Sequence, residues 1–231
     1  QTESMWLVAN HNTGAGWHLK VNLDGTLTFQ EFGSSSNDPI RETTTTETLD
    51  SLALAHVAVD VSQSQVNIWI NGVRKRNNTE RGEDIDYTNT TPYIGRAKLD
   101  SLGGHGFNGY IDEFKFFKFG GLLDTDITEI RMEGIPDSHT PVEFAHYTLD
   151  TSGAHPADFT QTTQDSVGSN HAIAFDVTFG DDPAEGGGFF IGSTGNDGST
   201  TSYVKIDTPS NFYLQTFSFS FWVKPSHTNI Y

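Results

Sequence analysis

The chain has 231 residues, of which 35% are hydrophobic and 12% aromatic, so it contains enough apolar material for a sizeable core. Its 13 Lys and Arg against 30 Asp and Glu give a net charge of −17, which argues against nucleic acid or an anionic membrane surface as a partner. No apolar run approaches the ~18 residues of a membrane span, and the lack of cysteine excludes disulfides, zinc–thiolate sites and thiol catalysis.

Short segments in which apolar and polar residues alternate recur along the chain and predict β-strands. They are Trp17–Val21, Leu27–Phe29, Val66–Ile70, Tyr110–Phe119, Tyr203–Ile206 and Phe217–Val223. Asn71-Gly72 is a strong hairpin signal. In the last segment, the three phenylalanines are predicted to face the core while Ser218 and Ser220 face away. Short strands at this spacing favour a sandwich of two sheets.

Residues 126–134 are the only segment with helical features. Asp126 and the residues after it resemble a capping box, isoleucines follow at helical spacing, and a C-terminal glycine precedes Pro136. We therefore expect a helix of two or three turns. The polar, proline-containing segment 135–143 is the best candidate for a linker.

Eight short motifs, four in each half of the chain, lie in a consistent order within that half. In the second half they are 147–153 (YTLDTSG), 165–172 (DSVGSNHA), 203–209 (YVKIDTP) and 219–225 (FSFWVKP). In the first half they are 56–72 (HVAVDVSQSQVNIWING), 93–96 (YIGR), 107–116 (FNGYIDEFKF) and 125–133 (TDITEIRME). The second-half set resembles the opening half, and the first-half set the closing half, of a laminin-G-like domain of the concanavalin A-like type. The resemblance implies an all-β jelly-roll sandwich of two antiparallel sheets with one short helix.

The closing half precedes the opening half in this chain. We therefore predict that residues 1–134 and 144–231 are the two halves of one domain, joined by 135–143, as in a circular permutation or a frame excised from a tandem array. Both ends of such a domain lie close together, so a short linker can rejoin them at little cost in closure entropy. Alternatively, the halves are exchanged between chains, which would assemble a homopolymer.

The resemblance also implies a structural calcium ion, Ca2+. In such domains an acidic residue of the strand that holds Asp112 and Glu113 often helps bind calcium near the opening segment, matched here by Asp165 and Asn170. Alternation places Asp112 on the face of the phenylalanines that follow it and Glu113 on the other face, so one acid needs a partner. Carboxylate and amide oxygens suit calcium. The alternative is a salt bridge to Lys or Arg, or a solvated turn.

Two further groups of residues are candidates for ligand contact or modification. Trp69 lies opposite the apolar face of its strand with Asn67 and Asn71, and a tryptophan flanked by amides can stack on a sugar ring. The alternative is a cross-strand contact on the second face of the sheet. Asn77 and Asn89 begin N-glycosylation sequons in predicted loops.

Catalysis has little support in the sequence. A glycosidase of this class needs two carboxylates that face each other, whereas Asp112 and Glu113 are adjacent and point to opposite faces. The resemblance therefore implies a non-catalytic recognition or adhesion module, extracellular or at the cell surface, that binds a glycan or another extracellular protein. The alternatives are a structural subunit of an extracellular fibre, sheath or matrix, assembled by exchange of domain halves, and a glycoside hydrolase.

Overall fold

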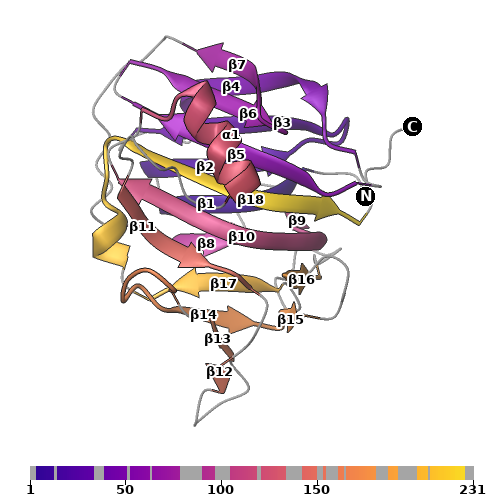
Figure 1. Ribbon diagram of the computed structural model, residues 1–231, viewed down its shortest axis with the longest axis vertical. Coiled ribbons are helices and arrows are strands. Elements are labelled where there is room, and N and C mark those ends of the chain that lie inside the picture. The colour runs from indigo at the N-terminus through magenta and orange to yellow at the C-terminus, as the bar shows by residue number, and fades with distance from the viewer. Residues whose placement is uncertain are drawn as a thin grey trace.

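The computed structural model describes residues 4–12, 15–33, 39–50, 53–62, 64–78, 90–96, 105–118, 121–133, 142–149, 153–154, 161–163, 165–180, 187–191, 202–207 and 209–226. Within these residues, two β-sheets of mainly antiparallel strands pack face to face, and one short α-helix lies on the outside (Figure 1). The predicted all-β, concanavalin A-like jelly-roll sandwich is therefore confirmed. None of the described helices is long and apolar enough to cross a membrane.

The strands are ordered differently in space and in sequence. The larger sheet runs β12 (Gly153–Ala154), β13 (Gln161–Thr163), β14 (Ala172–Phe175), β17 (Tyr203–Ile206), β8 (Pro92–Ile94), β1 (Met5–Asn12), β2 (Ala15–Val21), β3 (Thr26–Phe32), β4 (Pro39–Thr48), with β9 (His105–Gly106) beside β1. The smaller sheet runs β15 (Thr178–Phe179), β16 (Gly188–Phe190), β10 (Gly109–Lys118), β18 (Phe217–Pro225), β5 (Ala55–Val61), β6 (Val66–Ile70), β7 (Val73–Asn78), with β11 (Val142–Tyr147) beside β10. A 3₁₀ turn, η2 (Pro209–Phe212), precedes β18.

Strands from distant parts of the sequence lie side by side in both sheets. β18 pairs with β10 along one edge and with β5 along the other, and β17 pairs with β8 in the larger sheet. The segments before residue 134 and after residue 141 therefore contribute to the same two sheets. That these segments are the two halves of one permuted family domain stays a prediction.

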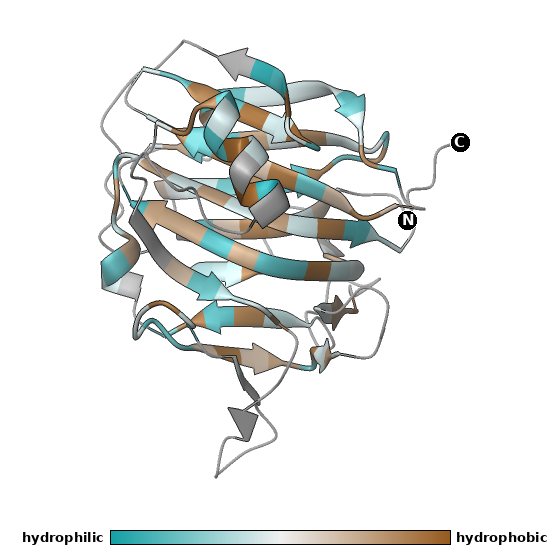
Figure 2. Ribbon diagram, in the orientation of Figure 1, coloured by the Kyte–Doolittle hydropathy of each residue, from teal (hydrophilic) through white to brown (hydrophobic). Residues whose placement is uncertain are grey.

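The core is built around a stack of aromatic rings supplied by both sheets. Trp17 of β2 lies nearly parallel to Phe219 of β18, with 5.1 Å between ring centroids and 13° between planes, and also stacks on Phe217. Phe221 extends the row along β18. All four rings are buried, which confirms the predicted core face of this strand. Figure 2 shows the matching alternation of apolar and polar residues along the strands of the smaller sheet.

The alternation predicted for β10 is wrong at Asp112. Pairing with β18 slips between Asp112 and Lys115, because Glu113 is an extra residue with a positive φ of 50°. Asp112 lies opposite Trp222 and therefore does not share the core face with Phe114. No carboxylate of this strand is forced into the apolar core, and both acids lie outside it.

The helix α1 (Asp124–Glu133) lies across the outer face of the smaller sheet (Figure 1). It begins two residues before the predicted start, and the carboxylate of Asp126 reaches back to accept the N–H of Leu123 at 2.8 Å. Asp126 is therefore the third helical residue and not the cap. The buried cluster beneath the helix consists of Ala58, Trp69, Phe117, Leu122, Ile127 and Ile130.

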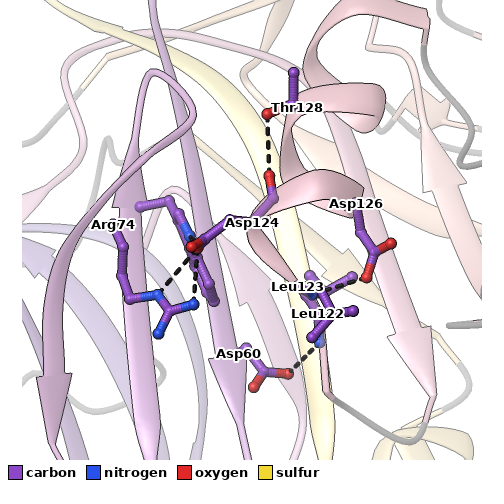
Figure 3. Close-up of polar contacts among 8 residues, drawn as sticks. Asp60, Arg74, Leu122, Leu123, Asp124, Asp126 and Thr128 are labelled. Atoms are coloured by element: carbon purple, nitrogen blue, oxygen red, sulfur yellow. Dashed lines mark hydrogen bonds and ion pairs between the residues drawn. The ribbon is translucent and has the colours of Figure 1, made fainter.

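The loop that leads into α1 is fixed to the sheet by the carboxylate of Asp60. This fully buried side chain of β5 accepts the backbone N–H groups of Gly121 and Leu122, and the hydroxyl of Ser218 at 2.7 Å. Figure 3 shows its contact with Leu122. A buried carboxylate needs such donors to offset the loss of hydration. Its position therefore sets where the helix begins on the sheet.

We expect the substitution Phe219→Ala to lower the free energy of unfolding by about 3–5 kcal/mol, because it opens a cavity in the aromatic stack. The matched control is Ser220→Ala on the opposite face, whose hydroxyl has no hydrogen bond to lose among the described residues. We expect that change to stay below about 1 kcal/mol. Urea denaturation measures both, and equally small losses would show that the two faces of β18 are assigned wrongly.

Candidate ligand-binding site

A pocket of about 170 Å³ lies on the outer face of the smaller sheet, beside the last turn of α1. Its walls come from three adjacent strands and the helix. The lining residues are His56, Glu113, Lys115, Ile130, Arg131, Ser220 and Trp222. The pocket is thus mostly polar, although it adjoins the apolar cluster beneath α1.

The strand register explains why these side chains meet. Trp222 of β18 lies directly opposite His56 of β5, and two residues earlier Ser220 lies opposite Lys115 of β10. Residues two apart on a strand point to the same face, so all four are on the outer face. The bulge in β10 adds Glu113 to the same group, because it inserts one residue next to the pocket.

Two buried polar atoms in this pocket lack a hydrogen bond. His56 and Ser220 are each only 1% exposed, yet within the described part of the chain His56 Nδ1 and Ser220 Oγ have no partner. The great majority of buried polar atoms in folded proteins are paired, so each exception calls for a physical explanation. Both atoms belong to residues that line the pocket, so they lie next to the space that a bound group would occupy.

Hydrogen bonds and an ion pair fix the charged side chains of the pocket. Glu113 Oε2 accepts a hydrogen bond from His146 Nε2 at 2.6 Å and lies 3.5 Å from Lys115 Nζ. The bond from His146, opposed by burial and aided by the charge of Lys115, holds the pKa of Glu113 below its ordinary value. Arg131 Nη1 donates to the carbonyl of Asn71 at 2.9 Å. Two cations and one carboxylate therefore surround the site.

The ring of His56 is neutral at physiological pH. Burial, reinforced by the positive charges of Arg131 and Lys115, lowers its pKa to about 3. The ring packs edge-on against Trp222, with 5.2 Å between centroids. A neutral imidazole offers one donor and one acceptor, so His56 can hydrogen-bond to a ligand without adding charge.

The prediction that Trp69 stacks on a sugar is wrong, because the ring is fully buried beneath α1. Its Nε1 donates to Asp124 at 2.7 Å, and the guanidinium of Arg74 lies 5.3 Å from the ring centre. Figure 3 shows Arg74 bonded to Asp124 at the start of the helix. Trp69 therefore anchors α1. The alternative prediction is a packing contact on the second face of the sheet, and the contact observed there is with the helix.

Asn67 and Asn71 have different surroundings. Asn67 is buried, whereas Asn71 occupies the exposed hairpin turn before β7 with a positive φ of 54°. Asn71 Oδ1 accepts the N–H of His56 at 3.0 Å, and its carbonyl accepts Arg131. Of the three predicted ligand residues, Asn71 alone contacts the pocket, and it does so by positioning two of its wall residues.

The residues predicted to bind calcium are joined through His146. The backbone N–H of His146 donates to Asp165 and its ring bonds to Glu113. The carboxylate of Asp165 also accepts the N–H groups of Val167 and Asn170. Burial would raise the pKa of Asp165, but these donors outweigh it and keep the pKa below its ordinary value. Asp112 Oδ1 accepts the N–H of Glu113 at 2.7 Å.

The same oxygens that would bind a cation are thus already hydrogen-bond acceptors. The side-chain oxygen of Asn170 accepts Asn211 at 2.7 Å, and its carbonyl accepts the hydroxyl of Tyr147. Among the described residues, no group of three or more His, Asp or Glu side chains is arranged to hold a metal ion. These contacts already supply donors to the oxygens that calcium would need, and the calcium site stays a prediction.

The family assignment follows from a comparison with known families. Residues 1–126 match the family model of the concanavalin A-like lectin/glucanases superfamily. The chain belongs to this superfamily. No curated protein and no solved structure matches it. The match ends before the motifs of residues 147–225, so the reversed order of the two halves rests on those motifs alone.

Glycosidases of this superfamily use a pair of carboxylates about 5–9.5 Å apart. Among the described residues that line the pocket, Glu113 is the one acid, and its carboxylate is bonded to His146 and Lys115. The described lining of this pocket therefore lacks the pair of carboxylates that this reaction uses. Asn77 lies in β7 and not in a loop, while its side chain and all of Asn89 are outside the described residues.

Removal of calcium tests the predicted cation site. Because N–H groups occupy the oxygens of Asp165 and Asn170, we expect thermal melting to give the same midpoint in calcium and in chelator. Asp165→Ala should lower both midpoints equally, and Asp207→Ala, an exposed control, should leave them unchanged. Calcium at ~100 times its dissociation constant would add about 2.7 kcal/mol. A midpoint that rises with calcium only when Asp165 is present would instead support the calcium site.

Proposed function

We propose that this domain is a non-catalytic, extracellular recognition module that binds a glycan in the pocket formed by His56, Ser220 and Trp222. The observation that carries this proposal is the pair of buried, unpaired polar atoms beside a half-buried tryptophan. Ligand sites combine an apolar or aromatic wall with a few well-placed polar groups. A sugar ring has both kinds of surface, since its C–H face can pack on Trp222 while its hydroxyls bond to His56 and Ser220.

The superfamily supports a binding role and leaves the ligand open. Its members include lectins and glucanases, as its description states. The single carboxylate in the described pocket lining favours the lectin-like alternative over hydrolysis. A role in adhesion follows if the glycan is carried by a cell-surface or matrix protein.

We expect Trp222→Ala to weaken binding to a panel of immobilised neutral and acidic oligosaccharides by about tenfold or more, because a sugar ring loses the aromatic surface on which it packs; a tenfold loss corresponds to about 1.4 kcal/mol. The control is Val73→Ala, which removes an apolar side chain that is 56% exposed on the edge strand β7. Melting curves verify that both variants are folded. Equal binding by wild type and Trp222→Ala would refute this site, and binding only to protein ligands would replace the glycan with a protein partner.

A second candidate function is a structural subunit that assembles by exchange of domain halves. The observation that favours it is the position of β18, which inserts between β5 and β10 and is paired on both edges. A strand in this position can be supplied by the same chain or by a neighbour with identical contacts. The second case would build a fibre, sheath or matrix.

Size-exclusion chromatography of the natively folded chain distinguishes these two functions. A closed recognition module should elute as a 25.4 kDa monomer across a dilution series. An exchanging subunit should elute at high mass and release monomer only after denaturation and refolding at low concentration. We expect the monomer at low concentration, because closure within one chain does not carry the entropy cost of association.

A further inference from the structure

We propose that the pocket beside α1 is specific for an acidic saccharide, whose carboxylate is bound between Lys115 and Arg131 while its ring packs on Trp222. This inference rests on the proposed function, because it names the class of glycan that the same pocket takes. It assigns a ligand site to the helix-covered face of the smaller sheet.

The charges around the pocket favour an anion. Lys115 and Arg131 contribute two positive charges and Glu113 one negative charge, which leaves the lining at +1 while the whole chain carries −17. Both cations line the same pocket as the buried ring of His56, and their positive charges add to burial in lowering its pKa. Asp112 lies directly opposite Trp222 on β10 but is not among the lining residues. A positive pocket on an acidic protein offers an anion a local attraction that the rest of the chain opposes.

The two positive side chains differ in accessibility. The side chain of Lys115 is 5% exposed and is paired with Glu113, so its charge is fixed in the wall of the pocket. Arg131 is on the exposed rim, where one guanidinium nitrogen is fixed by the carbonyl of Asn71. A guanidinium has five donors in a planar fork that matches a carboxylate. Arg131 can therefore bind an anion with the donors that Asn71 leaves unused.

The unpaired atoms fit the same ligand. Ser220 Oγ can donate a hydrogen bond, and neutral His56 can donate from Nδ1 in one tautomer. A carboxylate oxygen and the hydroxyls of the same sugar accept such bonds. Because burial makes an unmade hydrogen bond costly, a ligand that satisfies both atoms gains more than one that leaves them unpaired.

The aromatic wall argues for a sugar acid and against a simple inorganic anion. Trp222 is half-buried and packs against His56, so part of its ring borders the pocket. Sulfate or phosphate alone would contact the cations and leave this apolar surface in water. A pyranose ring with a carboxylate uses both surfaces, and a sulfated sugar provides a second source of the same negative charge.

NMR titration of the intact chain with glucuronate, glucose, glucose 6-sulfate and inorganic sulfate tests the inference. We expect glucuronate to bind about tenfold or more tightly than glucose, since hydrogen bonds to charged groups are stronger than neutral ones. Raising the salt concentration should weaken glucuronate binding and leave glucose binding unchanged. Comparison with glucose 6-sulfate distinguishes a carboxylate from a sulfate as the preferred anion.

The charge-removing variants are Arg131→Gln on the exposed rim and Lys115→Met, which keeps the length of the buried side chain. We expect each to reduce glucuronate affinity about tenfold and to leave glucose affinity within about twofold. Arg76→Gln is the matched control, because it removes the same charge from an exposed position on β7. The exposed position of Arg131 keeps the test valid if Lys115→Met fails to fold.

The possible failures are distinguishable. Equal affinity for glucuronate and glucose at this pocket would overturn the charge specificity and leave the proposed glycan-binding function in place. Binding of inorganic sulfate as tight as that of glucuronate would overturn the saccharide assignment in favour of an anion site. If none of the four probes perturbs the signals of His56 and Trp222, both this inference and the proposed site are refuted.

Discussion

The double-edged pairing of β18 is the constraint on which the rest of the structure depends. Because β18 is hydrogen-bonded to both β5 and β10, its side chains are fixed alternately toward the core and toward the outer face. The core face supplies the phenylalanines that stack on Trp17. On the outer face, Ser218 bonds to Asp60, which fixes the loop before α1, while Ser220 and Trp222 form the pocket. One strand thus connects core, helix and site.

The sequence predicted the fold class, the principal strands and the outer face on which the site lies, because period-two alternation reports directly on sheet faces. It failed where the structure depends on contacts between distant residues. The bulge at Glu113 shifted the assignment of Asp112, and no alternation pattern marks an inserted residue. The docking of α1 buried Trp69, whereas Trp222, two strands away, borders the pocket. Choosing between two tryptophans on one face requires knowing where the helix lies.

The two polar clusters at β10 and β11 differ in one physical respect. Around Asp165 and Asn170, carboxylate, amide and carbonyl oxygens all have donors, so the cluster is complete and stabilises its loop. Around His56 and Ser220, two buried atoms have no partner among the described residues. Buried polar atoms without partners lower the free energy of unfolding. Such atoms tend to be retained where a bound ligand can supply the missing hydrogen bonds. Hydrogen-bond satisfaction therefore distinguishes these two clusters, although buried atoms away from the pocket, such as Asp60 Oδ2 and Asn67 Oδ1, also have no partner among the described residues.

The same pairing of β18 bears on whether the domain closes on itself. The residues from 134 to 141 separate the end of α1 from the start of β11, and a segment of that length reaches at most about 25–30 Å. β11 pairs with β10, in the sheet that α1 covers, so both ends of this segment lie on the same sheet. Exchange would make the same contacts and differ only in the entropy of association. Closure within a chain is independent of concentration, whereas exchange is favoured by mass action as concentration rises. If the halves can exchange, local concentration, and not a difference in contacts, would decide between a discrete module and a polymer.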